Sequence, residues 1–294
     1  MNKLAYWSIY IMVKAIAVLP FSILYLLSDL LYLLVYKVIG YRKKVVSANL
    51  RNSFPEKTSD ELKEIERKFY HHFCDYLVES FKLFHISDEE IMKRAKINNK
   101  ELLFDLVEKN PGPVLMYIGH YGNWEWFTAS SLFFGDKLAS YQIYRKIKSK
   151  PIDQLFINLR ESFGALGIEK NDTLRAMIRL KKEKIRSQVA FLTDQTPSKA
   201  NIHYWTTFLN QDSAVLTGAE KIAEKLDLAV VYADVRKVKR GHYEADLQLI
   251  TANAKGAPEF SITEEYIRRM EKTILRDPAY WLWSHKRWKH KRES

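Results

Sequence analysis

The sequence predicts an α/β fold, with helices flanking a mostly parallel mixed sheet behind an N-terminal hydrophobic membrane-anchoring helical segment. From residue 114 onward, short apolar runs alternate with helical patterns, which is typical of a sheet covered by helices. Residues 4–41 are almost wholly apolar and differ from everything after them. The 294 residues suffice for one large α/β domain, and no repeat or linker indicates a second one.

The apolar N-terminal segment matches several kinds of membrane contact. Its charged residues are Lys14, Asp29 and Lys37. Its uncharged stretches are shorter than the roughly 20 residues that cross a bilayer, but residues 15–36 could cross once if Asp29 is tolerated. Pro20 and the charges make a membrane-embedded helical hairpin or an interfacial helix equally compatible with the pattern. The remaining alternative is a helix buried in the protein core.

Basic residues follow this segment directly, at Arg42, Lys43 and Lys44. By the positive-inside tendency, they place the body of the protein in the cytoplasm. We therefore expect residues 1–41 to be a membrane anchor and residues 42–294 to form the globular domain. The formal net charge of +12 favours an anionic partner, which could be nucleic acid, an anionic membrane surface or an acidic carrier protein.

The chain has one cysteine, Cys74, so it cannot form an intrachain disulfide. Because Cys74 lies in a helical, aromatic-rich run, we interpret it as a small core residue rather than a nucleophile. The sequence contains no His-Glu-x-x-His or paired-cysteine pattern. We therefore expect neither a metal site nor a cofactor.

Helix and strand signals follow in order along the chain. Thr58 or Ser59 can cap a helix that begins near Asp60 and continues to Phe84. After a turn at residues 110–113, the predicted strands cover residues 114–119, 138–144, 188–193, 229–235 and 243–250. The predicted helices cover residues 124–134, 152–163, 173–182, 214–226 and 262–275.

His120 comes directly after the predicted strand 114–119, where an open α/β sheet collects its functional groups. Glu125 follows five residues later, a step that leaves two side chains roughly 140° apart on one continuous helix. Gly122 can adopt a positive φ and Asn123 is a good N-cap, so the chain can fold back before a helix begins. We therefore expect the Glu125 carboxylate to hold one ring nitrogen of His120, leaving the other as a base.

The run Gly119-His120-Tyr121-Gly122-Asn123-Trp124-Glu125 resembles the His-x4-Asp/Glu motif of the late acyltransferases of lipid A biosynthesis, within the glycerolipid acyltransferase superfamily. Other blocks of this family are matched in the same order. They are residues 47–50 with 53–56, Tyr144-Arg145 with Arg160 and residues 163–164, residues 172–182 with Asp194-Gln195, and residues 280–287. The resemblance covers most of the chain.

The resemblance implies a membrane-associated O-acyltransferase at the cytoplasmic face of the inner membrane. Its acyl donor would be a thioester of acyl carrier protein or coenzyme A, and its acceptor a hydroxyl of a lipid A precursor. Another lysolipid or an amino-acid-linked lipid is the alternative acceptor. His120 would deprotonate the acceptor hydroxyl, which attacks the thioester directly, with Glu125 as its catalytic partner.

Five further residues are candidates for substrate contacts: Asn123, Arg145, Arg160, Asp194 and Gln195. A guanidinium matches phosphate oxygens, so the two arginines could hold a phosphate, although both could be ordinary surface residues. Arg145 or backbone N–H groups near Gly122 could stabilise an oxyanion. A helix cap explains Asn123 more readily than substrate contact does. At Asp194, a capping or carbonyl-holding role competes evenly with substrate contact.

The C-terminal tail is basic and aromatic. It contains Trp281, Trp283 and Trp288 with Lys286, Arg287, Lys289, Lys291 and Arg292. Such a tail suits interfacial anchoring or headgroup binding, or it is a solvated terminus. Together with the net charge, it also motivates a nucleic-acid-binding protein as the alternative of another class. We favour the acyltransferase, without a nucleic-acid partner, because no nucleic-acid module is recognisable and the apolar N-terminus would otherwise be unexplained.

Overall fold

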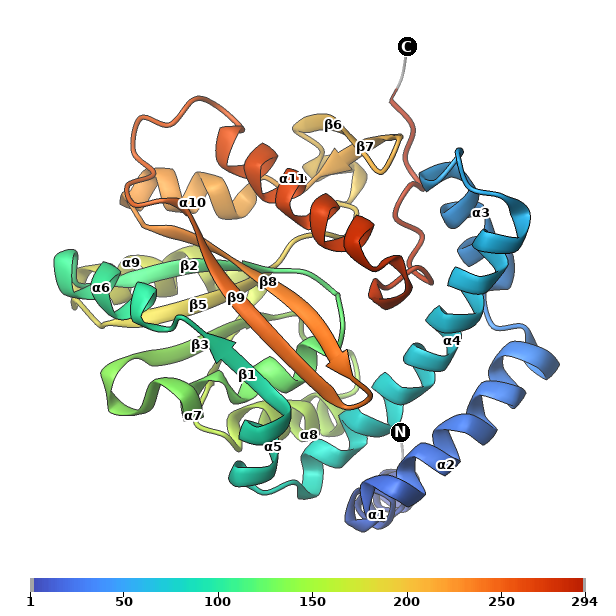
Figure 1. Cartoon of the computed structure of the whole chain (residues 1–294). Coiled ribbons are helices and arrows are strands. Elements are labelled where there is room, and N and C mark those ends of the chain that lie inside the picture. Colours follow the sequence, from blue (N-terminus) through green and yellow to red (C-terminus); the bar gives the residue numbers. More distant parts are fainter. Residues whose placement is uncertain (1–2, 293–294) are drawn as a thin grey trace.

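The computed structural model describes residues 3–292 and confirms the α/β fold (Figure 1). The described residues form a seven-stranded sheet in the order β1-β9-β8-β2-β5-β3-β4, and β6 and β7 form a separate pair. Neighbouring strands of the large sheet run parallel except β8 and β9, which are antiparallel. The strands are β1 (Ala95–Asn98), β2 (Pro113–Ile118), β3 (Ala139–Tyr144), β4 (Leu166–Glu169), β5 (Ser187–Leu192), β6 (Tyr204–Phe208), β7 (Gln211–Val215), β8 (Val230–Lys239) and β9 (His242–Thr251).

Helices flank this sheet, and those nearest the N-terminus lie to one side of it (Figure 1). The α-helices are α1 (Lys3–Val18), α2 (Phe21–Tyr32), α3 (Lys43–Ser53), α4 (Ser59–Lys82), α5 (Asp88–Arg94), α6 (Glu101–Lys109), α7 (Ser130–Phe134), α8 (Lys150–Glu161), α9 (Thr173–Lys182), α10 (Gly218–Leu226) and α11 (Ser261–Arg276). A π-helical segment, Leu33–Ile39, continues α2. Short 3₁₀ turns include Trp124–Ala129 and Pro278–Tyr280.

Most of the elements predicted along the chain are confirmed. The five predicted strands correspond to β2, β3, β5, β8 and β9, and the predicted helix 173–182 matches α9. The predicted helix 214–226 was wrong at its start, because Ala214 and Val215 belong to β7 and pair with β6. The helix itself begins at Gly218. Four short strands, β1, β4, β6 and β7, were not predicted because runs of four or five residues give little periodicity.

Helix α4 connects the N-terminal helices to the rest of the protein. Its cap is the predicted Thr58: the Thr58 hydroxyl accepts the Glu61 N–H (3.3 Å), and the Glu61 carboxylate accepts the Thr58 N–H (2.7 Å). Both α1 and α2 pack against α4. At the far end of α4, Lys82 Nζ donates to the carbonyls of Ala17 (2.8 Å) and Leu19 (2.9 Å), which satisfies the last groups of α1.

The apolar N-terminal segment is broken at Pro20, which is the N-cap of α2. Among the described residues, one helical segment, Phe21–Ile39, is long and apolar enough to cross a membrane. Its 19 residues would extend roughly 28 Å as an α-helix, close to the thickness of a bilayer core. Only 22% of its most apolar stretch is buried within the protein, which argues against the core-helix alternative. The segment is therefore a candidate membrane anchor.

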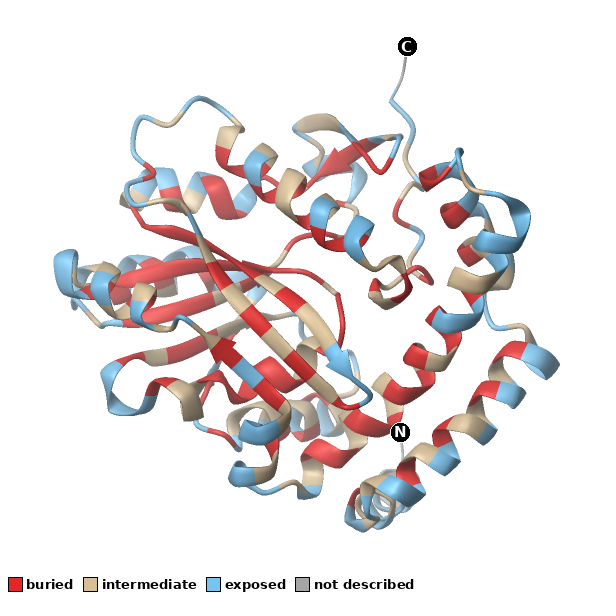
Figure 2. Cartoon of the chain, viewed as in Figure 1, coloured by how far each residue is buried: buried red, intermediate tan, exposed pale blue. Residues whose placement is uncertain are grey.

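The charges of this segment have partners elsewhere in the protein. Asp29 pairs with Arg240 at the β8–β9 turn (2.6 Å), and Lys14 Nζ donates to the carbonyl of Phe84 (3.0 Å). These contacts explain how an apolar segment tolerates charged residues. Its uncharged side chains, in contrast, remain largely exposed, as the pale faces of α1 and α2 show (Figure 2).

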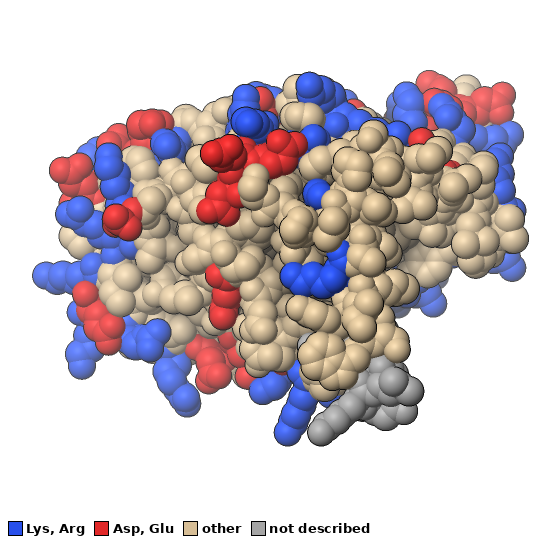
Figure 3. Space-filling model, turned by 90° about the horizontal axis from the view of Figure 1, so that it is seen from below, with Lys and Arg blue, Asp and Glu red and all other residues tan. Residues whose placement is uncertain are grey.

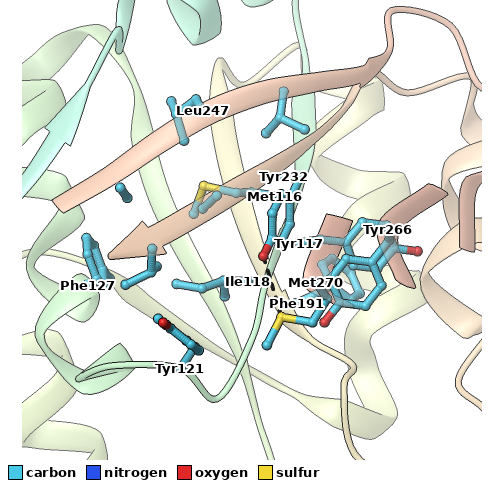
Figure 4. Close-up of a cluster of buried hydrophobic side chains, with 14 of the residues drawn as sticks. Met116, Tyr117, Ile118, Tyr121, Phe127, Phe191, Tyr232, Leu247, Tyr266 and Met270 are labelled. Atoms are coloured by element: carbon cyan, nitrogen blue, oxygen red, sulfur yellow. Dashed lines mark hydrogen bonds between the residues drawn. The ribbon is translucent and has the colours of Figure 1, made fainter. Parts of the chain in front are cut away.

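The core lies on both sides of the central strands. Every residue of β2 is buried, as expected for the middle strand of a covered sheet. Tyr117 stacks on Tyr266 of α11 with ring centroids 4.3 Å apart, and the Tyr232 hydroxyl contacts the Met270 sulfur at 3.5 Å (Figure 4). The packing of α11 on the sheet through these side chains fixes where β2 ends.

The prediction that the C-terminal tail anchors at a membrane interface was wrong for its tryptophans. Trp281 and Trp283 are buried, and the Trp288 indole donates to Ser213 (2.7 Å). Arg287 is also buried and donates to the carbonyl of Ala214 (2.7 Å). Only the lysines of the tail and Arg292 are exposed. The aromatic residues of this segment pack inside the fold because the chain returns beside the end of β2.

Candidate active site

His120 and Asp194 come together at the carboxyl ends of two neighbouring parallel strands. In the register of the sheet, Ile118 of β2 is opposite Leu192 of β5. His120 and Asp194 each follow two residues later, so the two side chains meet at the same edge of the sheet. Nδ1 of His120 lies 2.6 Å from Oδ1 of Asp194. Gly119 makes the close approach to α11 possible, because a Cβ there would lie 2.4 Å from the Met270 side chain.

The neighbours of the imidazole fix its tautomer. Asp194 is a carboxylate that can only accept, so Nδ1 of His120 carries the proton. Nε2 lies 3.1 Å from the amide nitrogen of Gln195, which donates to it. Nε2 is therefore the basic nitrogen, and a substrate hydroxyl that donated to it would take the place of the Gln195 amide. The imidazole keeps 16% of its surface exposed, so the ring can be reached.

Asp194 is held by three donors. Its Oδ2 accepts the His120 backbone N–H (3.1 Å) and the Trp281 indole N–H (2.8 Å), while Oδ1 accepts from the imidazole. Burial alone would raise the pKa of Asp194, but the His120 imidazole and these hydrogen bonds outweigh it and lower the pKa to about 2. Asp194 therefore stays ionised and can support an imidazolium.

The predicted contact between Glu125 and His120 was wrong. The Glu125 carboxylate instead accepts from Nη2 and Nε of Arg160 on α8, at 3.1 and 3.3 Å. Burial opposes the charge on Arg160, but the Glu125 carboxylate outweighs it and raises the pKa of the guanidinium. Glu125 lies in the 3₁₀ helix Trp124–Ala129, which directs its side chain to α8 rather than back to the imidazole.

Asn123 does not cap a helix with its side chain, contrary to the prediction. It is fully buried, and its amide donates to the Glu79 carboxylate on α4 (2.9 Å). The predicted left-handed conformation of Gly122 is confirmed, with φ of +62°. A Cβ at Gly122 would also lie 3.0 Å from the Tyr243 ring, so both backbone and packing require glycine there.

The C-terminal segment pairs with the loop that carries His120. Leu282 N–H donates to the His120 carbonyl (3.1 Å), and Gly122 N–H donates to the Tyr280 carbonyl (2.9 Å). Asn49 of α3 in turn holds the carbonyls of Trp283 and His285, at 2.9 and 3.0 Å. Segments from three distant parts of the chain thus fix the loop.

A narrow aromatic cleft opens beside His120. The ring of Trp124 lies against the imidazole, with centroids 5.0 Å apart. Helix α4 supplies one wall of the cleft and the C-terminal segment the other. The lining residues are Phe69, His72, Phe73, Tyr76, Trp124, Tyr280, Trp281 and Leu282. The cleft therefore offers an apolar surface next to a base.

These features match one known family of proteins. The sequence profile of the family described as bacterial lipid A biosynthesis acyltransferase matches residues 1–290. The chain belongs to this family. No curated protein matches the sequence. The match favours an acyltransferase over the nucleic-acid-binding alternative.

In this acyltransferase, Arg145 and Gln195 lie at the same edge of the sheet as His120. Arg145 directly follows β3, the parallel neighbour of β5, and its side chain is exposed. Among the described residues, Arg145 has no hydrogen-bond or ion-pair partner, whereas the other predicted arginine, Arg160, is occupied by Glu125. Arg145 is therefore the predicted arginine that is free to meet an anionic group.

Other nucleophiles and ligands of this acyltransferase are accounted for by packing. Cys74 is buried on α4, and burial raises the pKa of its thiol to about 12, so it is a poor nucleophile at neutral pH. Among the described residues, no group of three or more His, Cys, Asp or Glu side chains could hold a metal ion.

Proposed function

We propose that the protein transfers a fatty acyl group from a thioester to a hydroxyl of a lipid A precursor, with His120 as the general base. The observation that carries this proposal is the pair of contacts at the imidazole. Asp194 fixes the proton on Nδ1, which leaves Nε2 as a base at the exposed side of the ring. This arrangement performs acid–base chemistry without a protein nucleophile.

The reaction follows from this tautomer. The acceptor hydroxyl gives its proton to Nε2 of His120 while its oxygen bonds to the thioester carbonyl carbon. The resulting tetrahedral intermediate collapses, the carbon–sulfur bond breaks, and the imidazolium returns the proton to the departing sulfur. Asp194 stabilises the imidazolium between these two steps, as the buried carboxylate does in a Ser-His-Asp triad.

The oxyanion of the intermediate needs a donor. The Gly122 N–H, one of the predicted candidates, already donates to the Tyr280 carbonyl. Arg145 is exposed at the same sheet edge, so we assign it to this oxyanion or to a phosphate of the substrate. We assign Glu125 the role of holding Arg160 beside the base, because the two side chains form a two-point ion pair there.

The surroundings of the site suit lipid substrates. The aromatic cleft between α4 and the C-terminal segment can accept an acyl chain next to His120. Seen from below, the face on which α1 lies carries a broad uncharged area with few Lys or Arg residues within it (Figure 3). We propose that this face meets the inner membrane from the cytoplasm, with residues 1–41 as the anchor. Acyl carrier protein or coenzyme A would carry the donor acyl group.

Lipid mass spectrometry tests the proposed function. Cells with the wild-type gene, without it, and with His120→Ala are compared. Lipid A should lack one acyl chain in the last two, and purified His120→Ala should transfer roughly 10²–10⁴ times more slowly than wild type. An unchanged lipid A together with a missing chain on another lysolipid or amino-acid lipid would identify the alternative acceptor. Transfer by His120→Ala within about tenfold of wild type would exclude His120 as the base.

A further inference from the structure

Glu79 is a buried carboxylate outside the His120–Asp194 pair. It lies on α4 and is fully buried. Its Oε2 accepts from the Asn123 amide and from the Tyr243 hydroxyl of β9, both at 2.9 Å. Its Oε1 accepts from the Tyr25 hydroxyl of α2 at 3.1 Å. One carboxylate thus gathers donors from the catalytic loop, the sheet and the candidate membrane anchor.

Two of these donors control the turn between His120 and Glu125. Asn123 is part of the turn, and Tyr243 packs against Gly122 so closely that a Cβ there would be 3.0 Å from its ring. Both end on the same oxygen of Glu79. The carbonyl of Gly122 is also contacted by Nε2 of His72, one helical step from Glu79 on α4 (3.1 Å). The turn is therefore positioned from α4.

The third donor connects the turn to α2. Tyr25 belongs to the same helix as Ser28 and Asp29, and these residues are also tied to the protein. Ser28 donates to Asp75 of α4 (2.7 Å), and Arg240 bridges Asp29 and Asp75 at 2.6 and 2.7 Å. Helix α2 is thus docked through polar contacts and not only through its apolar face.

Such a network fails if one partner is lost. Burial of Glu79, followed by the nearby Asp75 carboxylate, raises its pKa to about 7, although Lys237 and the Asn123 and Tyr243 hydrogen bonds oppose this rise. A buried polar group without a partner is costly, so the three donors and the carboxylate depend on one another. Removing the carboxylate leaves Asn123 free to move together with the turn.

We propose that Glu79 is a positioning residue for acyl transfer, which fixes the Gly122–Asn123 turn and, through Tyr25, makes docked α2 part of the support of that turn. This inference rests on the proposed function of His120. The turn determines where His120 and Glu125 stand relative to each other and to bound substrate. A misplacement of about 1 Å at such a site lowers the rate by roughly 10²-fold.

The test uses the full-length protein in detergent, with kcat and KM measured for donor and acceptor. Glu79→Ala and Asn123→Ala should each lower kcat by roughly 10²-fold while KM changes less than about threefold. Because both act through one contact, the double variant should be about as slow as either single variant. Glu79→Gln keeps one acceptor for Asn123 and Tyr243 and can donate to Tyr25, so it should stay within about tenfold of wild type.

A milder variant keeps the test decisive if Glu79→Ala does not fold. Tyr25→Phe removes one hydroxyl and should lower kcat about three- to tenfold, since a single hydrogen bond is lost. Tyr204→Phe is its matched control, because the Tyr204 hydroxyl also donates to a carboxylate, that of Glu264, in another part of the fold. The inference is overturned if Tyr25→Phe behaves like this control or if the losses of Glu79→Ala and Asn123→Ala multiply. A wild-type protein without transferase activity would instead overturn the proposed function itself.

Discussion

Nδ1 of His120 lies 2.6 Å from Oδ1 of Asp194, although 74 residues separate the two in the sequence. The sheet accounts for this contact, because both residues follow neighbouring parallel strands by the same two-residue step. The residue that is close in the sequence, Glu125, pairs with Arg160 instead. The partner of the base is thus set by strand order rather than by spacing in the motif.

Asp194→Asn should lower kcat by roughly 10³–10⁴-fold without unfolding the protein, because the variant changes the tautomer of His120. Two donors, the His120 N–H and the Trp281 indole, point at Oδ2, so the amide oxygen of the variant will face them. Its NH₂ group then faces Nδ1, which must accept, and Nε2 carries the proton and loses its basicity. Steady-state kinetics together with NMR of the imidazole nitrogens measure both effects.

Asp246→Asn is a control of the same chemistry, since Asp246 pairs with Arg236 on β8 and is not part of the site. Near-wild-type activity of Asp194→Asn with an unchanged His120 tautomer would show that this carboxylate does not direct the base.

The folding stability of the protein should fall in acid through Asp194. The pKa of this carboxyl is lowered to about 2 in the folded protein and is about 3.9 when unfolded. Its contribution is therefore fully present above the unfolded pKa and is lost as the pH falls from roughly 5 towards 2. Thermal melts of wild type and Asp194→Asn across this range should converge at low pH. Curves separated by a constant amount down to pH 2 would contradict this assignment.

The sequence predicted the reactive histidine but not its surroundings. The position of His120 after a strand could be predicted because the apolar run before it is strong and the fold class is clear. Asp194 was predicted to end a strand, yet its contact with His120 depends on β2 and β5 being neighbours, and the order of strands leaves no local signal. A comparison of strand ends, each two residues before a polar side chain, was the signal that could have found the pair.

Glu125 and Arg160 should act as one unit. Glu125→Gln should be impaired less than His120→Ala, because it keeps the shape of the side chain and removes its charge. If Arg160 is held at the site only by this ion pair, Arg160→Ala will add little to Glu125→Gln. The measurement is a double-mutant cycle on kcat/KM. Full activity of Glu125→Gln at neutral pH, or fully additive losses, would mean that the pair does not work together.

Arg145→Ala should weaken catalysis or substrate use more than folding. The side chain is exposed at the sheet edge that carries His120 and has no partner among the described residues, so its removal breaks no internal contact. We expect a loss of roughly ten- to a hundredfold in kcat/KM, as for a charged hydrogen bond to substrate. Lys146→Ala tests an exposed neighbour on the same loop and should be close to wild type. Unchanged kinetics with both substrates would make Arg145 an ordinary surface residue.

The docking of the N-terminal helices was also beyond the sequence. The charges of the apolar segment were visible, but their partners, such as Arg240 for Asp29, lie more than 200 residues away in the sequence. A variant that lacks residues 1–41 would remove Tyr25 from Glu79 and uncover α4. It would change the catalytic domain as well as the anchor, so membrane binding is better tested by substitutions on the exposed face of α2.

The intact protein should remain bound to anionic vesicles in high salt. Exposed Lys and Arg contribute about 1 kcal/mol each near an anionic surface, and salt screens this attraction. Insertion of apolar side chains, at roughly 25 cal/mol per Å², is not screened in this way. Leu26 and Leu30 are 60% and 56% exposed on α2, so Leu26→Glu with Leu30→Glu should make binding weak and salt-sensitive.

The same double change at Leu166 and Leu275, which are 49% and 53% exposed in other parts of the fold, is the matched control and should leave binding unchanged. Co-sedimentation with vesicles across a salt series measures all three proteins. Because the substituted leucines point away from α4, neither variant should lose the contact between Tyr25 and Glu79. Complete release of the intact chain by salt would show that basic residues alone hold the protein at the surface, and that the apolar face of α2 does not enter the membrane.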